Sequence, residues 1–207
     1  MHELGIMGGA FNPPHNLHLL VAQLARDQFG LDKVLFIPSG NPPHKSIRGS
    51  KRRQSILLPK EARFELTEAA VAGTPFFQAS RIEIDRPGVT WSIDTLYELK
   101  RIYGDAVRLN FIIGDDNITT FRDYKRRKEI LSLCRLLVSP RKRKGNKSNE
   151  RMWRKMLPEA DMEFIDCPQF AISSTLVRDL AAQGKSVRYL VPPAVNRLIE
   201  KRRYFKS

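Results

Sequence analysis

The stretch GGAFNPPHNLHL, from Gly8 to Leu19, is the most informative about the fold, because it joins a short apolar run to an amphipathic one. The run LGIM precedes it, and residues 17–29 repeat apolar side chains near the period of a helix. A strand, a turn rich in glycine and proline, and a helix are therefore expected in that order. His15 and His18 lie three residues apart, so they should face the same way at the helix N-terminus, where two donors suit a phosphate chain.

Strand-like and helix-like segments alternate along the rest of the chain. Further strands are expected at 33–40, 76–84, 107–116, 134–140 and 162–167, and further helices at 58–73, 92–104, 173–184 and 192–205. Ser92 is expected to be the N-cap of the second of these helices, and Gly104 to end it. Strands separated by helices predict an α/β fold, a Rossmann-like doubly wound parallel sheet with helices on both faces.

Composition limits the class of protein and its partners. The chain has 207 residues and a net charge of +14, which favours anionic partners such as nucleotides. A single domain over residues 1–207 is expected, with a basic insert at about 141–155. The two cysteines lack the spacing of a zinc site, and no apolar run resembles a signal peptide or a membrane span. A cytoplasmic protein is therefore expected.

Two later turns add donors for anions. PSGNPPHK, residues 38–45, repeats the string Asn-Pro-Pro-His and ends in Lys45. In ISSTLVR, residues 172–178, Ser173 is expected to cap a helix whose first-turn N–H groups and hydroxyls, together with Arg178, would form an anion site. In parallel sheets ligands bind beyond the carboxyl ends of the strands, where these turns are expected.

GGAFNPPHNLH and ISSTLVR together resemble the paired signature of the nucleotidyltransferase superfamily, GxFxPxHxxH and ISSTxxR. Between them NPPHK, WSIDTL and FIIGDDN, in that order, resemble the nicotinate-nucleotide adenylyltransferase family. The resemblance extends from residue 4 to about residue 195. It implies adenylyl transfer from ATP to nicotinate mononucleotide, which gives deamido-NAD and pyrophosphate in NAD biosynthesis.

Three positions depart from the family pattern. Leu17 stands where bacterial members usually have glycine, although the eukaryotic branch accepts a bulky residue there. Asp115 replaces a small residue in the usual GAD. Tyr124 falls where the family places a tryptophan that stacks on the pyridine ring, so an aromatic face is kept.

The resemblance implies three groups of site residues. Those expected to catalyse the transfer are His15, His18 and Arg178. Those expected to bind ATP are Gly8, Gly9, Ala10, Phe11, Gly114, Asp116, Ser173, Ser174 and Thr175. Those expected to bind the mononucleotide are Lys45, Trp91, Ser92 and Tyr124. No protein ligand to a metal is expected, because Mg²⁺ would be carried mainly by the ATP phosphates.

Other functions remain open at this point. Pantetheine-phosphate adenylyltransferases share the two end motifs but are shorter and usually lack NPPHK and WSIDTL, and a nicotinamide mononucleotide adenylyltransferase is a closer alternative. A basic nucleic-acid-binding protein is an alternative from another class, but the segment 141–155 holds a single aromatic residue, Trp153, and no RNA-binding signature is visible. ATP and nicotinate mononucleotide are the expected partners, without nucleic acid or membrane; the oligomeric state stays open.

Overall fold

The computed structural model of the chain describes residues 2–42, 57–115, 118, 121, 124, 126–139, 146–168 and 170–206. They divide into two compact units, each built from separated segments of the chain. Unit 1 comprises Met1–Gly8, Val21–Leu35 and Trp91–Phe170, and unit 2 comprises Gly9–Leu20, Phe36–Thr90 and Ala171–Ser207.

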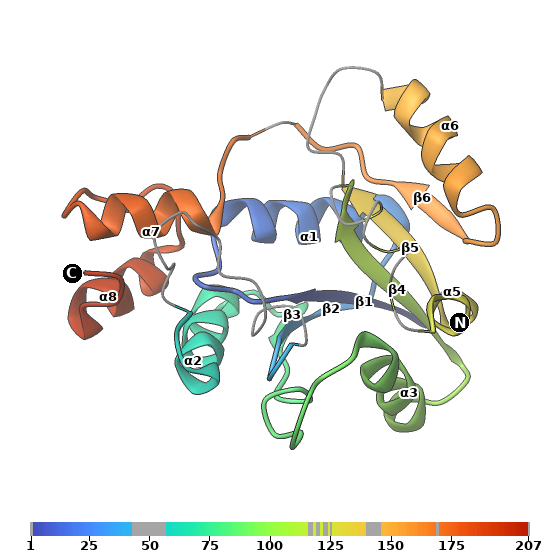
Figure 1. Cartoon of the computed structure of the whole chain (residues 1–207), viewed down its shortest axis with the longest axis horizontal. Coiled ribbons are helices and arrows are strands. Elements are labelled where there is room, and N and C mark those ends of the chain that lie inside the picture. Colours follow the sequence, from blue (N-terminus) through green and yellow to red (C-terminus); the bar gives the residue numbers. More distant parts are fainter. Residues whose placement is uncertain are drawn as a thin grey trace. The chain divides into compact units, whose positions relative to one another are not determined.

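Six strands are hydrogen-bonded side by side in the order β3-β2-β1-β4-β5-β6 (Figure 1). Their bounds are β1 (His2–Gly9), β2 (Lys33–Pro38), β3 (Phe77–Ala79), β4 (Val107–Gly114), β5 (Cys134–Ser139) and β6 (Met162–Phe164). The pairs β1–β4, β4–β5 and β5–β6 are parallel. The strand order reverses beside β1, as in other doubly wound sheets. The predicted fold class is confirmed.

Helices alternate with these strands along the chain. Their bounds are α1 (Asn16–Phe29), α2 (Lys60–Val71), α3 (Ser92–Tyr103), α5 (Arg127–Leu133), α6 (Asn146–Met156), α7 (Ser174–Ala182) and α8 (Pro193–Arg202). Among the described residues, no helix combines the length and the apolar character needed to cross a membrane.

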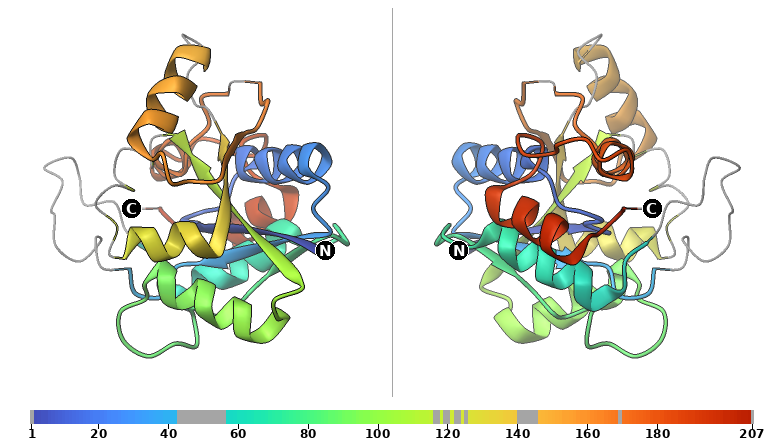
Figure 2. Two further views of the ribbon diagram at one scale, coloured as in Figure 1. Left: turned by 90° about the vertical axis from the view of Figure 1, so that its right-hand side faces the viewer. Right: turned by 90° about the vertical axis from the view of Figure 1, so that its left-hand side faces the viewer.

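Unit 1 is built on buried parallel strands. Residues 109–113 of β4 and 136–139 of β5 are all buried, and most are apolar, as expected for strands covered on both faces. Helices α3 and α5 pack against each other and against these strands, and α1 covers the opposite face of the sheet (Figures 1 and 2). The basic segment 141–155 includes most of α6, which connects the parallel strands β5 and β6. Parallel neighbours need a crossover of this kind.

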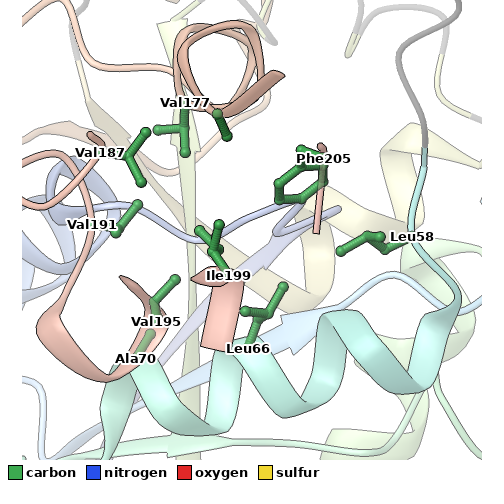
Figure 3. Packing of buried hydrophobic residues seen from close by; sticks show 10 residues of the cluster. Leu58, Leu66, Ala70, Val177, Val187, Val191, Val195, Ile199 and Phe205 are labelled. Atoms are coloured by element: carbon green, nitrogen blue, oxygen red, sulfur yellow. The ribbon is translucent and has the colours of Figure 1, made fainter. Parts of the chain in front are cut away.

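Unit 2 has a hydrophobic core shared by α2, α7 and α8 (Figure 3). Leu58 and Phe205 belong to the same cluster. Each helix contributes two apolar residues four positions apart, which lie on one face: Leu66 and Ala70, Val177 and Ala181, and Val195 and Ile199. Because Val177 lies one turn after the beginning of α7, this core fixes the position of the ISSTLVR motif.

Helix α5 was not predicted from the sequence, and two further details differ from the sequence-based predictions. The strand expected over 76–84 ends at Ala79. Ser80 N still donates to Phe36 O of β2 (2.9 Å), but the chain then turns, with Asp85 N donating to Arg81 O (2.9 Å). The predicted cap of α3 is wrong by one residue. Trp91 is the N-cap, in an extended conformation, and Ser92 is the first helical residue.

Candidate active site

The first turn of the site follows β1 and holds an unusual backbone conformation. Phe11 has a φ of +44°, which is uncommon for a residue with a side chain, and the Asn12–Pro13 peptide bond is cis. The Phe11 ring is buried, edge-on to the ring of His18 with centroids 5.1 Å apart and tilted against Phe36 at 5.8 Å. Phe11 can keep this conformation only when neighbouring segments stabilise it.

His15 and His18 lie together, as their spacing predicts. Their rings stack with centroids 3.6 Å apart, and His15 is buried. The backbone N–H of His15 donates to Nδ1 of His18 (3.1 Å), so this nitrogen is an acceptor. A neutral His18 therefore carries its proton on Nε2, which makes that atom a hydrogen-bond donor.

The N-terminus of α7 is fastened to the same turn. Ser173 caps the helix as predicted, its hydroxyl accepting from Leu176 N (3.2 Å). The hydroxyl of Ser174 donates to Pro13 O (2.8 Å). Its proton is therefore engaged within the protein, contrary to the expectation that this hydroxyl adds a donor for an anion.

Arg178 bridges the turn and the helix. Its Nη1 donates to Asn12 O (2.8 Å) and its Nη2 to Thr175 Oγ1 (3.2 Å). Burial of the guanidinium lowers the pKa of Arg178, which means that it has lost hydration without ceasing to be a cation. A partly dehydrated guanidinium next to a helix N-terminus is an arrangement suited to phosphate oxygens.

Arg63, on α2, belongs to the same set of contacts and was not singled out from the sequence. It is almost completely buried, and its guanidinium donates to the carbonyls of Leu58, Ala10 and Gly40 at 3.0–3.1 Å. Burial lowers its pKa, and the charge of Glu83 acts in the opposite direction. A signal was present, since Arg63 occupies the buried stripe of α2 where an apolar residue is usual.

Two glycines of the site differ in why they lack a side chain. The atoms nearest to a Cβ on Gly9 would be those of the Phe11 ring, at 3.6 Å or more, which is ordinary contact. A Cβ on Gly40 would lie 2.0 Å from the carbonyl oxygen of Glu83, so the backbone leaves no room there. Internal packing explains Gly40 but not Gly9, and a close approach by a ligand would explain Gly9.

Gly40→Ala is therefore expected to lower the free energy of unfolding by about 3 kcal/mol, near the upper end of overpacking effects. Gly9→Ala, the matched control, should change it by about 0.5 kcal/mol or less. Urea unfolding followed by circular dichroism measures both values. Equal destabilisation by the two substitutions would contradict this account of the two turns.

The remaining predicted residues lie in unit 1 or outside the described residues. Gly8 is the last residue but one of β1, and Gly114 ends the neighbouring strand β4. Trp91 and Ser92 begin α3, where Asp94 N and Thr95 N both donate to Trp91 O (3.1 and 3.3 Å). The remaining three are Tyr124, whose ring stacks on Phe121 with centroids 4.7 Å apart, and Lys45 and Asp116, which lie outside the described residues.

The donor set of unit 2 fits anions. It consists of the imidazole of His18, the guanidinium of Arg178 and the hydroxyl of Thr175. Within the described part of the chain, no group of three or more His, Cys, Asp or Glu side chains could hold a metal ion.

Comparisons with known proteins agree with this chemistry. Residues 6–180 match the model of the cytidylyltransferase-like family. The chain is 40% identical to a protein named probable nicotinate-nucleotide adenylyltransferase from Thermoanaerobacter sp. (strain X514), over 99% of this chain and 95% of the relative. It is 37% identical to a protein of the same name from Moorella thermoacetica, over 99% and 92%.

A solved structure supports the fold. Nicotinic acid mononucleotide adenylyltransferase from Plasmodium falciparum, complexed with NaAD, matches with a TM-score of 0.76 and 15% identity, over 99% of this chain and 98% of that one.

Proposed function

The chain belongs to the nicotinate-nucleotide adenylyltransferases, a family of nucleotidyltransferases, and we propose that unit 2 binds the phosphates of ATP during transfer of its adenylyl group to nicotinate mononucleotide. The observation that carries this proposal is that the backbone of one turn, residues 12–15, is hydrogen-bonded to both a histidine and an arginine. His15 N donates to the His18 ring, and Arg178 donates to Asn12 O. The turn thus fixes two phosphate-binding groups relative to each other.

The reaction needs no nucleophile from the protein. An oxygen of the mononucleotide phosphate attacks the α-phosphorus of ATP and forms the new P–O bond. The bond from the α-phosphorus to the oxygen shared with the β-phosphate breaks, and pyrophosphate leaves with that electron pair. The protein aligns the two phosphates and stabilises the charge that develops on their oxygens.

Each group in unit 2 has a proposed role that follows from its contacts. Nε2 of His18 donates to the reacting α-phosphate, and His15 stacks on His18 and contributes its imidazole to the triphosphate site. Arg178 holds the departing pyrophosphate, and the Thr175 hydroxyl, which accepts from Arg178, retains its own proton for a phosphate oxygen. The small residues Gly9 and Ala10, with the Phe11 backbone, line the turn. Ser174 acts indirectly, by holding Pro13 to α7.

The other predicted residues, most of which belong to unit 1, have roles proposed from the family resemblance. Gly8, Gly114 and Asp116 are assigned to the ATP site, the latter two at the adenosine ribose. Trp91, Ser92, Tyr124 and Lys45 are assigned to the mononucleotide. The N-terminus of α3 supports this assignment for Ser92, because its backbone N–H belongs to the first turn, where the helix dipole favours an anion.

Enzymes of this family use ATP with a divalent cation, and we propose Mg²⁺ for this chain. Mg²⁺ keeps several waters and binds through substrate phosphates, which agrees with a donor set in unit 2 made for anions. When bound it would neutralise charge on the triphosphate. The cytoplasmic location and the single domain stay predictions from the sequence.

The test of the proposed function is the choice of acceptor. Pyrophosphate release from ATP and Mg²⁺ should require a mononucleotide, and kcat/KM for nicotinate mononucleotide should exceed that for its amide by about tenfold or more. A carboxylate gains from the dipole at a helix N-terminus, by about 1–2 kcal/mol when partly buried, whereas an uncharged amide does not. A ratio near one would contradict the acid as substrate, and release that is equal without an acceptor would contradict the transfer itself.

A further inference from the structure

We propose that Arg63 is a positioning residue for adenylyl transfer, which sets the orientation of the Ala10–Phe11 peptide and ties the turn after β1 to the turn after β2. This inference rests on the proposed function, because the positioned turn is the one assigned to the ATP phosphates. Arg63 itself is buried and is not proposed to touch a substrate.

The guanidinium of Arg63 is bonded to three separate segments. Nη1 donates to Ala10 O (3.0 Å) in the first turn, Nη2 to Gly40 O (3.1 Å) in the second, and Nε to Leu58 O (3.1 Å) just before α2. A rigid planar group with fixed donor directions therefore joins the ends of two strands to the helix. Burying a cation for this purpose is costly, and an apolar side chain at the same place would suffice for packing alone.

Because the peptide group is planar, the bond from Arg63 to Ala10 O also fixes the direction of the Phe11 N–H. The carbonyl and N–H of a trans peptide point in opposite directions, so the Phe11 N–H points away from Arg63 when Ala10 O points toward it. The second turn shows the same relation: Gly40 O accepts from Arg63, and the next N–H, that of Asn41, donates to Thr90 Oγ1 (3.2 Å). Loss of the bond to Ala10 O would free the Ala10–Phe11 peptide to rotate.

The conformation of Phe11 makes such rotation consequential. Its φ of +44° is disfavoured for a residue with a Cβ, so it is maintained by contacts on both sides. Arg63 holds the preceding carbonyl, and Asn12 Oδ1 accepts from Leu58 N (3.2 Å) on the following side. Asn12 O also accepts from Arg178. A change at the Ala10–Phe11 peptide would therefore displace Arg178, which is proposed to bind a phosphate.

The turn at Gly40 cannot shift to compensate for a displacement of the turn after β1. A Cβ at Gly40 would lie 2.0 Å from Glu83 O, and Gly40 N is 3.4 Å from Glu83 Oε2, so this turn is closely packed against the segment that carries Glu83. Arg63 thus fixes the first turn against a rigid neighbour. A small displacement of reacting groups is enough to slow a transfer reaction substantially.

The experiment compares Arg63→Lys with Arg135→Lys. Arg135 is a matched control in unit 1, because it is also mostly buried and its guanidinium also bridges two side chains, Asn110 (2.7 Å) and Glu3 (3.3 Å). A lysine can replace the charge of either arginine but not its several directed bonds. Thermal unfolding and steady-state kinetics with ATP and nicotinate mononucleotide are measured for both variants and for the wild type.

We expect both variants to lose similar thermal stability, whereas kcat should fall about 10²-fold in Arg63→Lys alone, with little change in KM for the mononucleotide. Guanidinium ions at millimolar concentration should restore part of the activity of Arg63→Ala, and ammonium ions should not. Arg63→Gln replaces the lysine variant if the latter does not fold.

Parallel losses of stability and kcat in both variants would show a merely structural role and overturn the inference. A normal kcat in Arg63→Lys would also overturn it. Loss of folding in both Arg63→Lys and Arg63→Gln would do the same. In each of these outcomes an active wild type leaves the proposed function standing. A wild type that does not form deamido-NAD would instead overturn the proposed function together with the inference.

Discussion

Replacement of His18 by alanine should lower kcat for dinucleotide formation by about 10²–10³-fold, the usual effect of removing one donor that stabilises a transition state. The reason lies in the hydrogen bond from His15 N to Nδ1, which leaves Nε2 as the donor of the neutral ring. A preorientated donor stabilises charge that develops only during transfer, so ATP binding should weaken much less than kcat falls.

Two measurements separate the loss of kcat from the loss of ATP binding in His18→Ala. Stopped assays of dinucleotide formation at saturating substrates give kcat, and calorimetry gives the affinity for ATP. His2→Ala is the control, because His2 is exposed in unit 1 and forms an ion pair with Asp32 only when protonated. Near-normal turnover in His18→Ala would remove His18 from the catalytic machinery.

Arg178→Ala should cause the largest loss, about 10³-fold in kcat/KM, because it removes a cation from the proposed pyrophosphate site. It also removes the bonds to Asn12 O and Thr175 Oγ1 that fasten α7 to the turn. Arg178→Lys should recover part of this loss but not all, since an ammonium cannot hold two phosphate oxygens and the Asn12 carbonyl with the same geometry.

The reverse reaction reports on this residue directly. KM for pyrophosphate in the synthesis of ATP from deamido-NAD should rise in both Arg178 variants and more in the alanine variant. Arg188→Ala, which changes an exposed arginine that lies over the ring of Tyr189 in the same unit, is the control. Equal activity of Arg178→Lys and the wild type would show that charge alone matters at this position.

Much of the fold could be predicted because its signals are local. The glycines and prolines after β1, the helical period of α1 and the serine that caps α7 each lie within a few residues of the structure they specify. The errors arose where a distant contact decides the outcome. The strand over 76–84 was predicted too long, because the turn that replaces its second half, where Arg81 is bonded to Glu61 of α2, cannot be read from residue types.

The same distinction applies to the site. The residue types and spacing of His15 and His18 were informative, since residues three apart at a helix N-terminus face the same way, and the two rings meet. The engagement of Ser174 with Pro13 and the bonds of Arg63 to Ala10 join residues far apart in sequence, and their acceptors are backbone carbonyls, which every residue carries. No side-chain pattern marks such partners.

Adenylyl transfer is expected to be direct, between two bound phosphates, without a covalent intermediate on the protein. A single-turnover reaction with enzyme in excess, nicotinate mononucleotide, Mg²⁺ and ATP radiolabelled at its α-phosphate tests it most directly. After quenching in acid, label is expected only in ATP and deamido-NAD, with one pyrophosphate released for each dinucleotide formed. Label retained on the denatured protein, or label released as AMP in place of the dinucleotide, would contradict it.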